Sequence, residues 1–184
     1  MICGDIDFAC TKCRLSKGRT QVVPGTGPCN SRIVFIGEAP GREEDLKGEP
    51  FVGRGGKLLD KVLEEAGSDR SEVFICNLVK CRPPNNRRPK KDEIEACSQF
   101  LKSELETVRP KVICALGQTV ASNLLNRKGK MADLAKTSVS ANVAGIRVKF
   151  FVAYHPAACL YQRKNIGSLK RSIQASLKAA KRKT

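Results

Sequence analysis

Four short apolar runs, separated by segments with helical periodicity, constrain the fold of this chain more than any other feature. The runs are rich in Val, Ile and Phe and are mostly apolar on both faces, as buried parallel strands are. They cover residues 32–37, 73–78, 111–117 and 147–154. Strands that alternate with helices predict a parallel sheet covered by helices on both faces. We therefore expect an α/β fold, built as a three-layer α/β/α sandwich.

The helical segments are indicated by apolar residues at intervals of three and four. Such stripes predict helices over residues 58–66, 94–108 and 118–125. The last 18 residues, 167–184, predict an amphipathic terminal helix, whose basic face is either simply solvated or an approach surface for DNA. Residues 126–145 are interpreted as a polar connection, with a strand in part of it as the alternative.

The charge of the chain indicates a polyanionic partner. With 34 Lys and Arg against 18 Asp and Glu, the formal net charge is +16, more than solubility requires. Nucleic acid is the favoured partner and an anionic membrane the second choice, while a merely solvated basic surface is the alternative to both. The length fits one compact domain over residues 1–184.

The N-terminal sequence and the cysteine count bear on the cellular compartment. There is no run of about 18 apolar residues, and "MICGDIDFACTKC" lacks the basic and apolar blocks of a signal peptide. We expect a cytoplasmic protein with no membrane partner. Because the cytosol keeps thiols reduced, the nine cysteines are not expected to form disulfides, and metal ligation or catalysis is the favoured use.

Four of the cysteines form the most specific pattern in the chain. Cys10 and Cys13 make a C-x-x-C motif, and Cys81 and Cys97 follow at well-defined positions. A small core residue is the alternative for Cys97, and the cysteines inside predicted strands, Cys76 and Cys114, fit that alternative. Four thiolates hold either zinc or an iron-sulfur cluster, and the spacing does not choose between them.

The loop after the first strand, "GEAPGREEDLKGEPFVGRGG" at residues 37–56, carries six glycines and two prolines. Ligands of such sheets bind beyond the carboxyl ends of the strands, which is where this loop begins. It matches neither of the glycine-rich phosphate motifs, and its acidic residues would repel phosphate. Phe51 offers a stacking face, so the loop favours a flat neutral ligand. A glycine-rich turn without a ligand is the alternative.

Two further side chains follow predicted strands at the same edge. His155 is the single histidine of the chain, and Pro156 restricts the backbone after it. Here it is a candidate hydrogen-bond donor to a developing oxyanion. Asn77 can present a paired donor and acceptor to the edge of a base. The alternatives are a structural histidine and an ordinary turn residue.

The motifs "GEAPGREED", "PFVGRGG", "ICNLVKCRPPNNRRP" and "HPAA", preceded by the C-x-x-C pair, together resemble the family 4 uracil-DNA glycosylases, iron-sulfur enzymes of many thermophilic bacteria and archaea. The resemblance extends from about Cys10 to the terminal helix. It implies a central four-stranded parallel sheet in an α/β/α sandwich and hydrolysis of the bond that joins uracil to deoxyribose. It also implies a [4Fe-4S] cluster held by Cys10, Cys13, Cys81 and Cys97.

The resemblance assigns roles to individual pocket residues. Phe51 is expected to stack on uracil, Asn77 to read its Watson-Crick edge, and His155 to donate to O2 of the leaving base. Glu44 is expected to exclude the 5-methyl group of thymine. Ala39 occupies the position of the water-positioning aspartate of the best-known uracil-DNA glycosylase family, so Glu38 is the leading candidate for that task. The uracil-binding set is Gly37, Glu38, Ala39, Glu44, Phe51, Asn77 and His155.

DNA contacts are expected from two loops. In the loop after His155, either Leu160 or Tyr161 resembles a minor-groove wedge that fills the gap left by a flipped base, with an ordinary surface loop as the alternative. The cations expected at the DNA backbone are Arg82, Arg87, Arg88 and Arg163. No lysine matches a Schiff-base motif, so we expect a monofunctional enzyme that leaves an abasic site.

Two other functions remain open at this point. One is a protein of the same fold that captures uracil in DNA without turnover, although the Arg-rich, His-containing insertion of that related branch is missing here. The other is a zinc protein that binds nucleic acid structurally. For the glycosylase we expect a monomer that acts on uracil-containing DNA, single- or double-stranded, with a replication clamp as a candidate protein partner.

Overall fold

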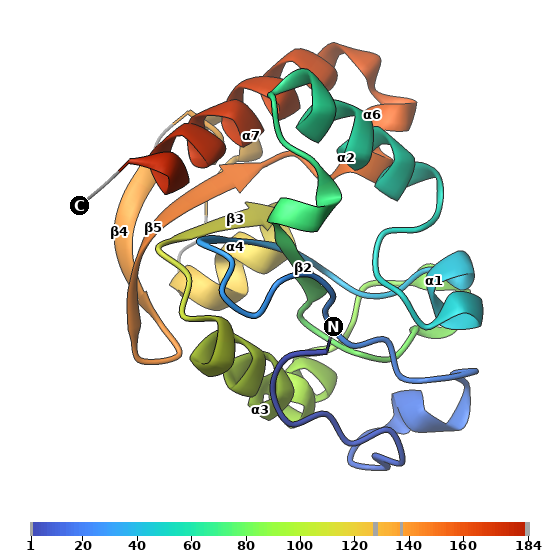
Figure 1. Cartoon of the computed structure of the whole chain (residues 1–184). Helices are drawn as coiled ribbons and strands as arrows, with labels where there is room; N and C mark the ends of the chain where they lie inside the picture. Colours follow the sequence, from blue (N-terminus) through green and yellow to red (C-terminus); the bar gives the residue numbers. More distant parts are fainter. Residues whose placement is uncertain (1, 127–128, 137, 183–184) are drawn as a thin grey trace.

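The computed structural model describes residues 2–126, 129–136 and 138–182 and has an α/β fold (Figure 1). Its sheet has five strands in the order β2-β1-β3-β5-β4. Four of them are parallel and match the predicted runs, and β4 is antiparallel to β5. The strands are β1 (Ile33–Gly37), β2 (Phe74–Asn77), β3 (Val112–Leu116), β4 (Ser138–Val143) and β5 (Ile146–Ala153).

The prediction of a four-stranded sheet is therefore wrong, because the sheet has a fifth strand, β4, at one edge. In β4, Ser138, Ser140 and Asn142 are exposed and alternate with more buried neighbours. This polar alternation belongs to an edge strand with one solvated face, and it lacks the continuous apolar run of a central strand. Ala144 and Gly145 both have positive φ and close a two-residue hairpin between β4 and β5. In the polar connection predicted over 126–145, residues 127–128 and 137 lie outside the described part.

Helices flank the sheet on both faces, as the alternating pattern predicts. Figure 1 shows α2, α6 and α7 on one face and α3 and α4 on the other. Within β1, Ile33 and Phe35 face the first layer while Val34 and Ile36 face the second. The helices are α1 (Arg42–Lys47), α2 (Arg54–Glu65), α3 (Lys91–Val108), α4 (Gln118–Leu125), α5 (Met131–Leu134), α6 (Pro156–Tyr161) and α7 (Ile166–Lys181), with short 3₁₀ turns η1 (Arg14–Lys17), η2 (Arg70–Glu72), η3 (Pro84–Asn86) and η4 (Arg163–Asn165).

The parallel strands bring the predicted site residues to one edge. Gly37 and Asn77 are register partners at the carboxyl ends of β1 and β2. β5 ends at Ala153, two residues before His155. The three strand ends therefore lie at the same edge of the sheet, with β3 between β1 and β5, although the residues are far apart in the sequence.

The N-terminal segment ahead of β1 has little regular structure and is anchored by specific contacts. The Asp5 N–H donates to Ser103 Oγ on α3 at 2.8 Å. Cys3 and Cys29 form a disulfide, and Cys3 is 1% exposed. The expectation that no cysteines pair is therefore wrong for these two. Cys3 is buried and Cys29 is half-buried, which limits the access of thiols in solution to this disulfide.

An ion pair lies inside the core, between the segment that follows β2 and helix α3. Lys80 and Glu104 are 1% and 0% exposed, and Lys80 Nζ lies 2.5 Å from Glu104 Oε2. Burial acts to lower the pKa of Lys80, but the Glu104 carboxylate and the neighbouring Cys76 and Cys97 sulfurs together outweigh it, and the pKa is raised. The Lys80 side chain is therefore charged at neutral pH.

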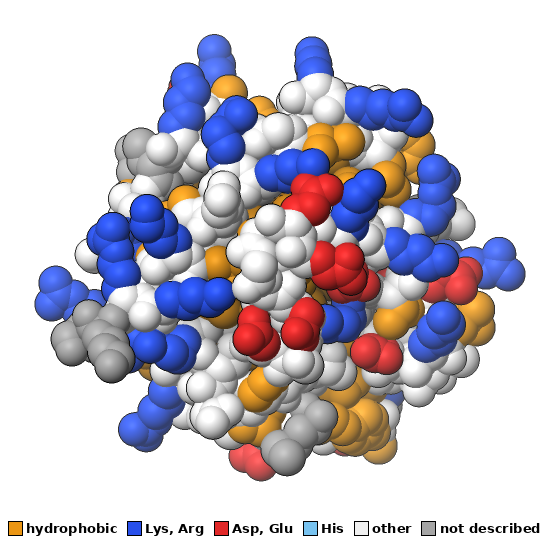
Figure 2. All heavy atoms as spheres, turned by 45° about the horizontal axis from the view of Figure 1, so that its top comes forward, with side chains coloured by type: hydrophobic (Ala, Val, Ile, Leu, Met, Phe, Trp, Pro, Cys, Tyr) orange, Lys and Arg blue, Asp and Glu red, His pale blue; other side chains and the backbone are white. Residues whose placement is uncertain are grey.

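The surface is rich in positive charge. Figure 2 shows Lys and Arg side chains spread around one face, with several acidic side chains nearer its centre. On this face the positive side chains are spread out and do not form a single stripe. Within the described residues, no helix is both long and apolar enough to cross a membrane.

The disulfide generates a stability prediction. Replacing Cys3 by Ser should lower the free energy of unfolding by about 3 kcal/mol, because the 26-residue separation of the two cysteines makes a sizeable loop that the unfolded chain must otherwise close. We expect a drop of roughly 5–10 °C in Tm, measured by circular dichroism. Wild-type protein in excess reductant, where the disulfide is opened chemically, is the control and should match the variant; equal Tm values with and without the disulfide would contradict the prediction.

Candidate active site

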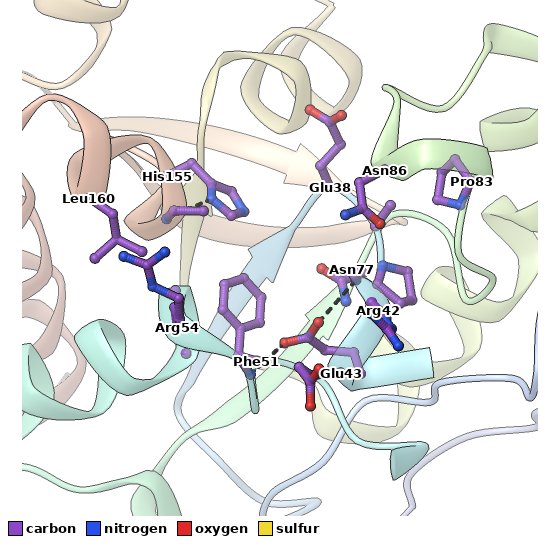
Figure 3. A pocket seen from close by; sticks show the side chains of 18 of the residues that line it. Glu38, Arg42, Glu43, Phe51, Arg54, Asn77, Pro83, Asn86, His155 and Leu160 are labelled. Carbon is purple, nitrogen blue, oxygen red and sulfur yellow. Dashed lines mark hydrogen bonds between the residues drawn. The ribbon is translucent and has the colours of Figure 1, made fainter. Parts of the chain in front are cut away.

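A cavity of about 460 Å³ opens at the carboxyl edge of the sheet. Its volume is typical of a site for a small molecule. Figure 3 shows His155, Phe51 and Asn77 around it. The predicted uracil-binding residues that line it are Glu38, Ala39, Glu44, Phe51, Asn77 and His155. Three predicted DNA contacts line it as well: Leu160 and Tyr161 on α6, and Arg87 directly after η3.

Phe51 forms a wall of the cavity and is held in an unusual backbone conformation. Its φ is 55°, a left-handed value that is rare for a bulky residue. A β-carbon on Gly56 would lie 1.7 Å from the Phe51 carbonyl oxygen, so this position requires glycine. The Arg70 guanidinium donates to the same oxygen at 3.0 Å and also to the Pro50 carbonyl. Sequence reasoning missed Arg70, which lies outside every motif.

Glu44 is used as a structural acceptor. Its Oε1 accepts from the N–H groups of Val52 and Gly53, at 3.0 and 2.8 Å, and its Oε2 accepts from the Gly41 N–H at 3.1 Å. The carboxylate thereby joins the start of α1 to the chain that follows Phe51. Its expected role against the thymine methyl group remains a prediction.

Asn77 presents an unsatisfied acceptor. The residue is 2% exposed, and its Oδ1 has no hydrogen-bond partner among the described residues. Buried polar atoms are nearly always paired, and an orphaned one costs about 1–3 kcal/mol. Asn77 also lines the cavity. An amide in this state is ready to accept a hydrogen bond from a ligand.

His155 caps α6, which fixes the state of its ring. Its Nδ1 accepts from the Ala157 N–H at 3.2 Å. A neutral imidazole that accepts at Nδ1 carries its proton on Nε2. Burial lowers the pKa of His155 to about 4, and the nearby Glu44 carboxylate only partly opposes this. The ring is therefore neutral at pH 7 and can donate from Nε2. It also stacks on Phe51, with the ring centroids 5.7 Å apart.

Glu38 and Ala39 lie on the loop that leaves β1. The Glu38 carbonyl accepts from the Val79 N–H at 3.3 Å, which ties this loop to the segment after β2. The Glu38 side chain points away from Asn77 (Figure 3). Its carboxylate is thus at the cavity but does not contact the amide of Asn77.

The predicted DNA contacts differ in how they are held. Arg87 is paired through both terminal nitrogens with Glu93, at 2.8 and 2.6 Å. This hydrogen-bonded pair, more than any other contact, lowers the pKa of Glu93 to about 2. Arg82 donates to Asn86 at 2.7 Å. Arg88 and Arg163 are exposed. Tyr161 is 83% exposed beside the cavity, whereas Leu160 is half-buried.

The four cysteines of the predicted metal set lie together. Cys10, Cys13, Cys81 and Cys97 line one small cavity beside α3. Among the described residues, no three or more His, Cys, Asp or Glu side chains are placed to hold a single metal ion. Burial raises the pKa of Cys97 to about 11 and also raises that of Cys81, so these two thiols are protonated at neutral pH.

The surroundings of these thiols fit a sulfur-ligated group. Arg19 donates to the Cys81 Sγ at 3.4 Å and to the Cys10 carbonyl at 2.6 Å. The Lys80 N–H donates to the Cys97 Sγ at 3.3 Å. N–H donors to sulfur stabilise the negative charge that thiolates bring to a metal or an iron-sulfur cluster. The other three free cysteines, Cys76, Cys114 and Cys159, are buried elsewhere in the core.

Comparison with known proteins identifies the family. The family model for the uracil DNA glycosylase superfamily matches residues 24–179. The type-4 uracil-DNA glycosylase of Archaeoglobus fulgidus is 47% identical over 163 residues, which cover 84% of this chain and 80% of that protein. The type-4 uracil-DNA glycosylase of Saccharolobus solfataricus is 48% identical over 83% of this chain and 73% of that protein. The type-4 uracil-DNA glycosylase of Thermotoga maritima is 44% identical over 94% of this chain and 88% of that protein. The chain therefore belongs to the uracil-DNA glycosylase superfamily, in its type-4 family.

Proposed function

We propose that this chain, as a single domain over residues 1–184, hydrolyses the N-glycosidic bond of deoxyuridine flipped out of DNA, without cleaving the strand. The observation that carries the proposal is the unsatisfied Oδ1 of Asn77 in a cavity that also holds the Phe51 ring and the neutral His155. A flat base with a donor on its edge would satisfy this acceptor.

Recognition follows from the donors and acceptors of the bases. Uracil presents the N3–H donor and the O4 acceptor, which complement Oδ1 and Nδ2 of Asn77. Cytosine presents the opposite pattern and would leave buried groups unpaired. Phe51 supplies an apolar face for stacking. Gly37 and Ala39 complete the loop beside the base.

Access to the base requires that the nucleotide leave the stack, which costs a few kcal/mol. Leu160 and Tyr161 beside the cavity would occupy the space that the base vacates. The half-buried Arg82 and the exposed Arg88 and Arg163 would contact phosphates and offset part of the cost. Arg87, which is paired with Glu93, serves chiefly to hold its loop.

The chemical step needs stabilisation of the leaving group. As the bond between N1 and C1′ breaks, its electron pair stays on uracil and the sugar becomes positively charged. His155 donates from Nε2 to uracil O2 and stabilises the anion, a contribution of ~3 kcal/mol for one such donor. Water then adds at C1′ and loses a proton, which leaves an abasic sugar. Glu38 is the proposed residue that orients this water.

We further propose that Cys10, Cys13, Cys81 and Cys97 hold a [4Fe-4S] cluster. These four residues would join the N-terminal segment to the chain after β2 and to α3 through the cluster, and none of them lines the cavity that holds Asn77 and His155. Uracil-containing DNA is the proposed partner, and the protein acts as a monomer.

Two pocket substitutions test the assignment of roles. Asn77→Ala removes two hydrogen bonds to uracil and should lower kcat/KM by roughly 100-fold. His155→Ala removes the oxyanion donor and should lower kcat by roughly 100- to 1,000-fold. Base release is measured on an oligonucleotide with one deoxyuridine, followed by hot alkali. Gln162→Ala is the control, because Gln162 is an exposed residue directly after α6. Full activity in both pocket variants with an unchanged fold would refute the assignment.

The state of His155 is directly observable because the chain has one histidine. Its pKa of about 4 lies below the ordinary 6.5, so the folded state favours the neutral ring. The stability that this provides is complete above pH 6.5 and declines as the pH falls toward 4. Imidazole resonances in NMR spectra should show no titration between pH 5 and 8. A midpoint near 6.5 would contradict a neutral donor held by burial.

Removing one proposed ligand tests the cluster. Cys97→Ser should abolish iron binding and the broad visible absorption of an iron-sulfur cluster, and should lower Tm. Cys114→Ser is the matched control, because Cys114 is fully buried in β3 and lies outside the cysteine site. Iron is measured by elemental analysis. Zinc in the wild-type protein, or unchanged iron in the Cys97 variant, would overturn the proposed cluster.

A further inference from the structure

Lys80 contacts one residue of the cysteine site and one residue of the uracil pocket. It precedes Cys81, and its main-chain N–H donates to the Cys97 Sγ at 3.3 Å. Its side-chain Nζ donates to the Asn77 carbonyl oxygen at 2.9 Å. One residue therefore contacts a proposed cluster ligand and the proposed uracil-reading residue.

The side chain of Lys80 is held by a built arrangement. Nζ also donates to Glu104 Oε2, and Glu104 Oε1 accepts from the Gly25 N–H at 2.7 Å. Both charged groups are fully enclosed. Separating the two groups would leave an unpaired charge in the core, which is strongly unfavourable. The Glu104 carboxylate therefore holds the Lys80 ammonium beside the Asn77 carbonyl.

A role for Lys80 in contacting substrate does not fit its position. The side chain is 1% exposed and lines the cavity of the cysteines, whereas the uracil cavity is lined by other residues. It therefore reaches neither a phosphate nor the sugar. Its ammonium is committed to Asn77 and Glu104.

The main chain around Lys80 carries the connection further. The Leu78 N–H donates to the Gly37 carbonyl at 2.9 Å, and the Val79 N–H donates to that of Glu38 at 3.3 Å. On its other side the Lys80 carbonyl accepts from the Val23 N–H at 2.7 Å. A shift of this segment would therefore move Asn77 and the loop after β1 together.

We infer that Lys80 is a positioning residue that couples the cysteine site to uracil recognition. The Lys80–Glu104 pair holds the main chain between Asn77 and Cys81, so that loss of order at the cysteine site is transmitted to the Asn77 amide. This inference rests on the proposed role of Asn77 in reading uracil. It gives the cysteine site an effect on base selectivity in addition to its effect on stability.

The test is a double-mutant cycle with a binding readout. The variant Lys80→Met/Glu104→Gln removes the ion pair without leaving an unpaired charge. Affinity is measured for an oligonucleotide with one uncleavable 2′-fluoro-2′-deoxyuridine and for the same oligonucleotide with thymidine. The ratio of the two affinities reports uracil recognition separately from general DNA binding. Iron content and Tm are recorded for every variant.

The pair variant should retain iron and lose about tenfold in the affinity ratio, the scale found for residues that orient a ligand or a metal-binding group. Cys97→Ala should cause a similar loss in the wild-type background but little further loss in the pair variant, because the connection is already broken. Lys170→Met/Glu65→Gln removes a Lys–Glu contact of the same 2.5 Å length on the surface. It is the matched control and should leave the ratio unchanged.

An unchanged ratio in the pair variant, or the same loss from Cys97→Ala in both backgrounds, would overturn the coupling. If the pair variant does not fold, Lys80→Gln/Glu104→Gln is carried through the same cycle, since it also leaves no unpaired charge and glutamine at position 104 retains an acceptor for Gly25. Asn77→Ala separates the two proposals. An unchanged ratio in that variant means that Asn77 does not read uracil, whereas a lost ratio combined with additive Cys97 effects refutes only the coupling.

Discussion

The site depends on one close contact, in which the side chains of Phe51 and Asn77 both pack against the α-carbon of Gly37. A β-carbon on Gly37 would lie 2.4 Å from Asn77 Oδ1 and 2.5 Å from the Phe51 ring. Because that space is free, the amide and the ring meet at one point of the sheet edge, where β1 and β2 end in register. Arg70, Gly56 and Glu44 then hold the chain around Phe51 against its unfavourable backbone conformation. These contacts tie the chain around Phe51 to α1 through Glu44 and to the start of α2 through Gly56.

A second set of ties holds the segments with little regular structure. The Thr20 N–H donates to the Asp45 carboxylate at 2.9 Å, which links the N-terminal segment to α1. Arg14 pairs with Asp92 at the start of α3, and Arg87 pairs with Glu93 one residue later. Together with the Cys3–Cys29 disulfide, these contacts hold the segments that carry the four proposed cluster ligands. Polar contacts take this role because the N-terminal segment buries few apolar side chains of its own.

The sequence predicted the parallel strands and main helices well, because continuous apolar runs and regular stripes report burial directly. It failed for β4, whose Ser, Val, Ser, Ala and Asn residues carry a weak alternating pattern that also fits a loop. For the site, the motifs named His155, Asn77, Phe51 and the four cysteines, and the structure brings the first three to one cavity and the cysteines to another. The Arg87–Glu93 pair, the three hydrogen bonds of Glu44 and the disulfide were not predicted, because pairing partners leave no trace in a single sequence.

The sequence by itself determined the fold class, the edge of the sheet where the site lies and the residue types available for chemistry there. Periodicity decides which faces are buried, and parallel topology decides where the strand ends meet. Only the tertiary structure decided the state of those residues. Whether His155 is neutral, whether Asn77 Oδ1 is free and whether Arg87 is available to DNA depend on desolvation and on partners brought from distant parts of the chain. These quantities are set by distances of a few ångströms, which residue spacing along the chain does not specify.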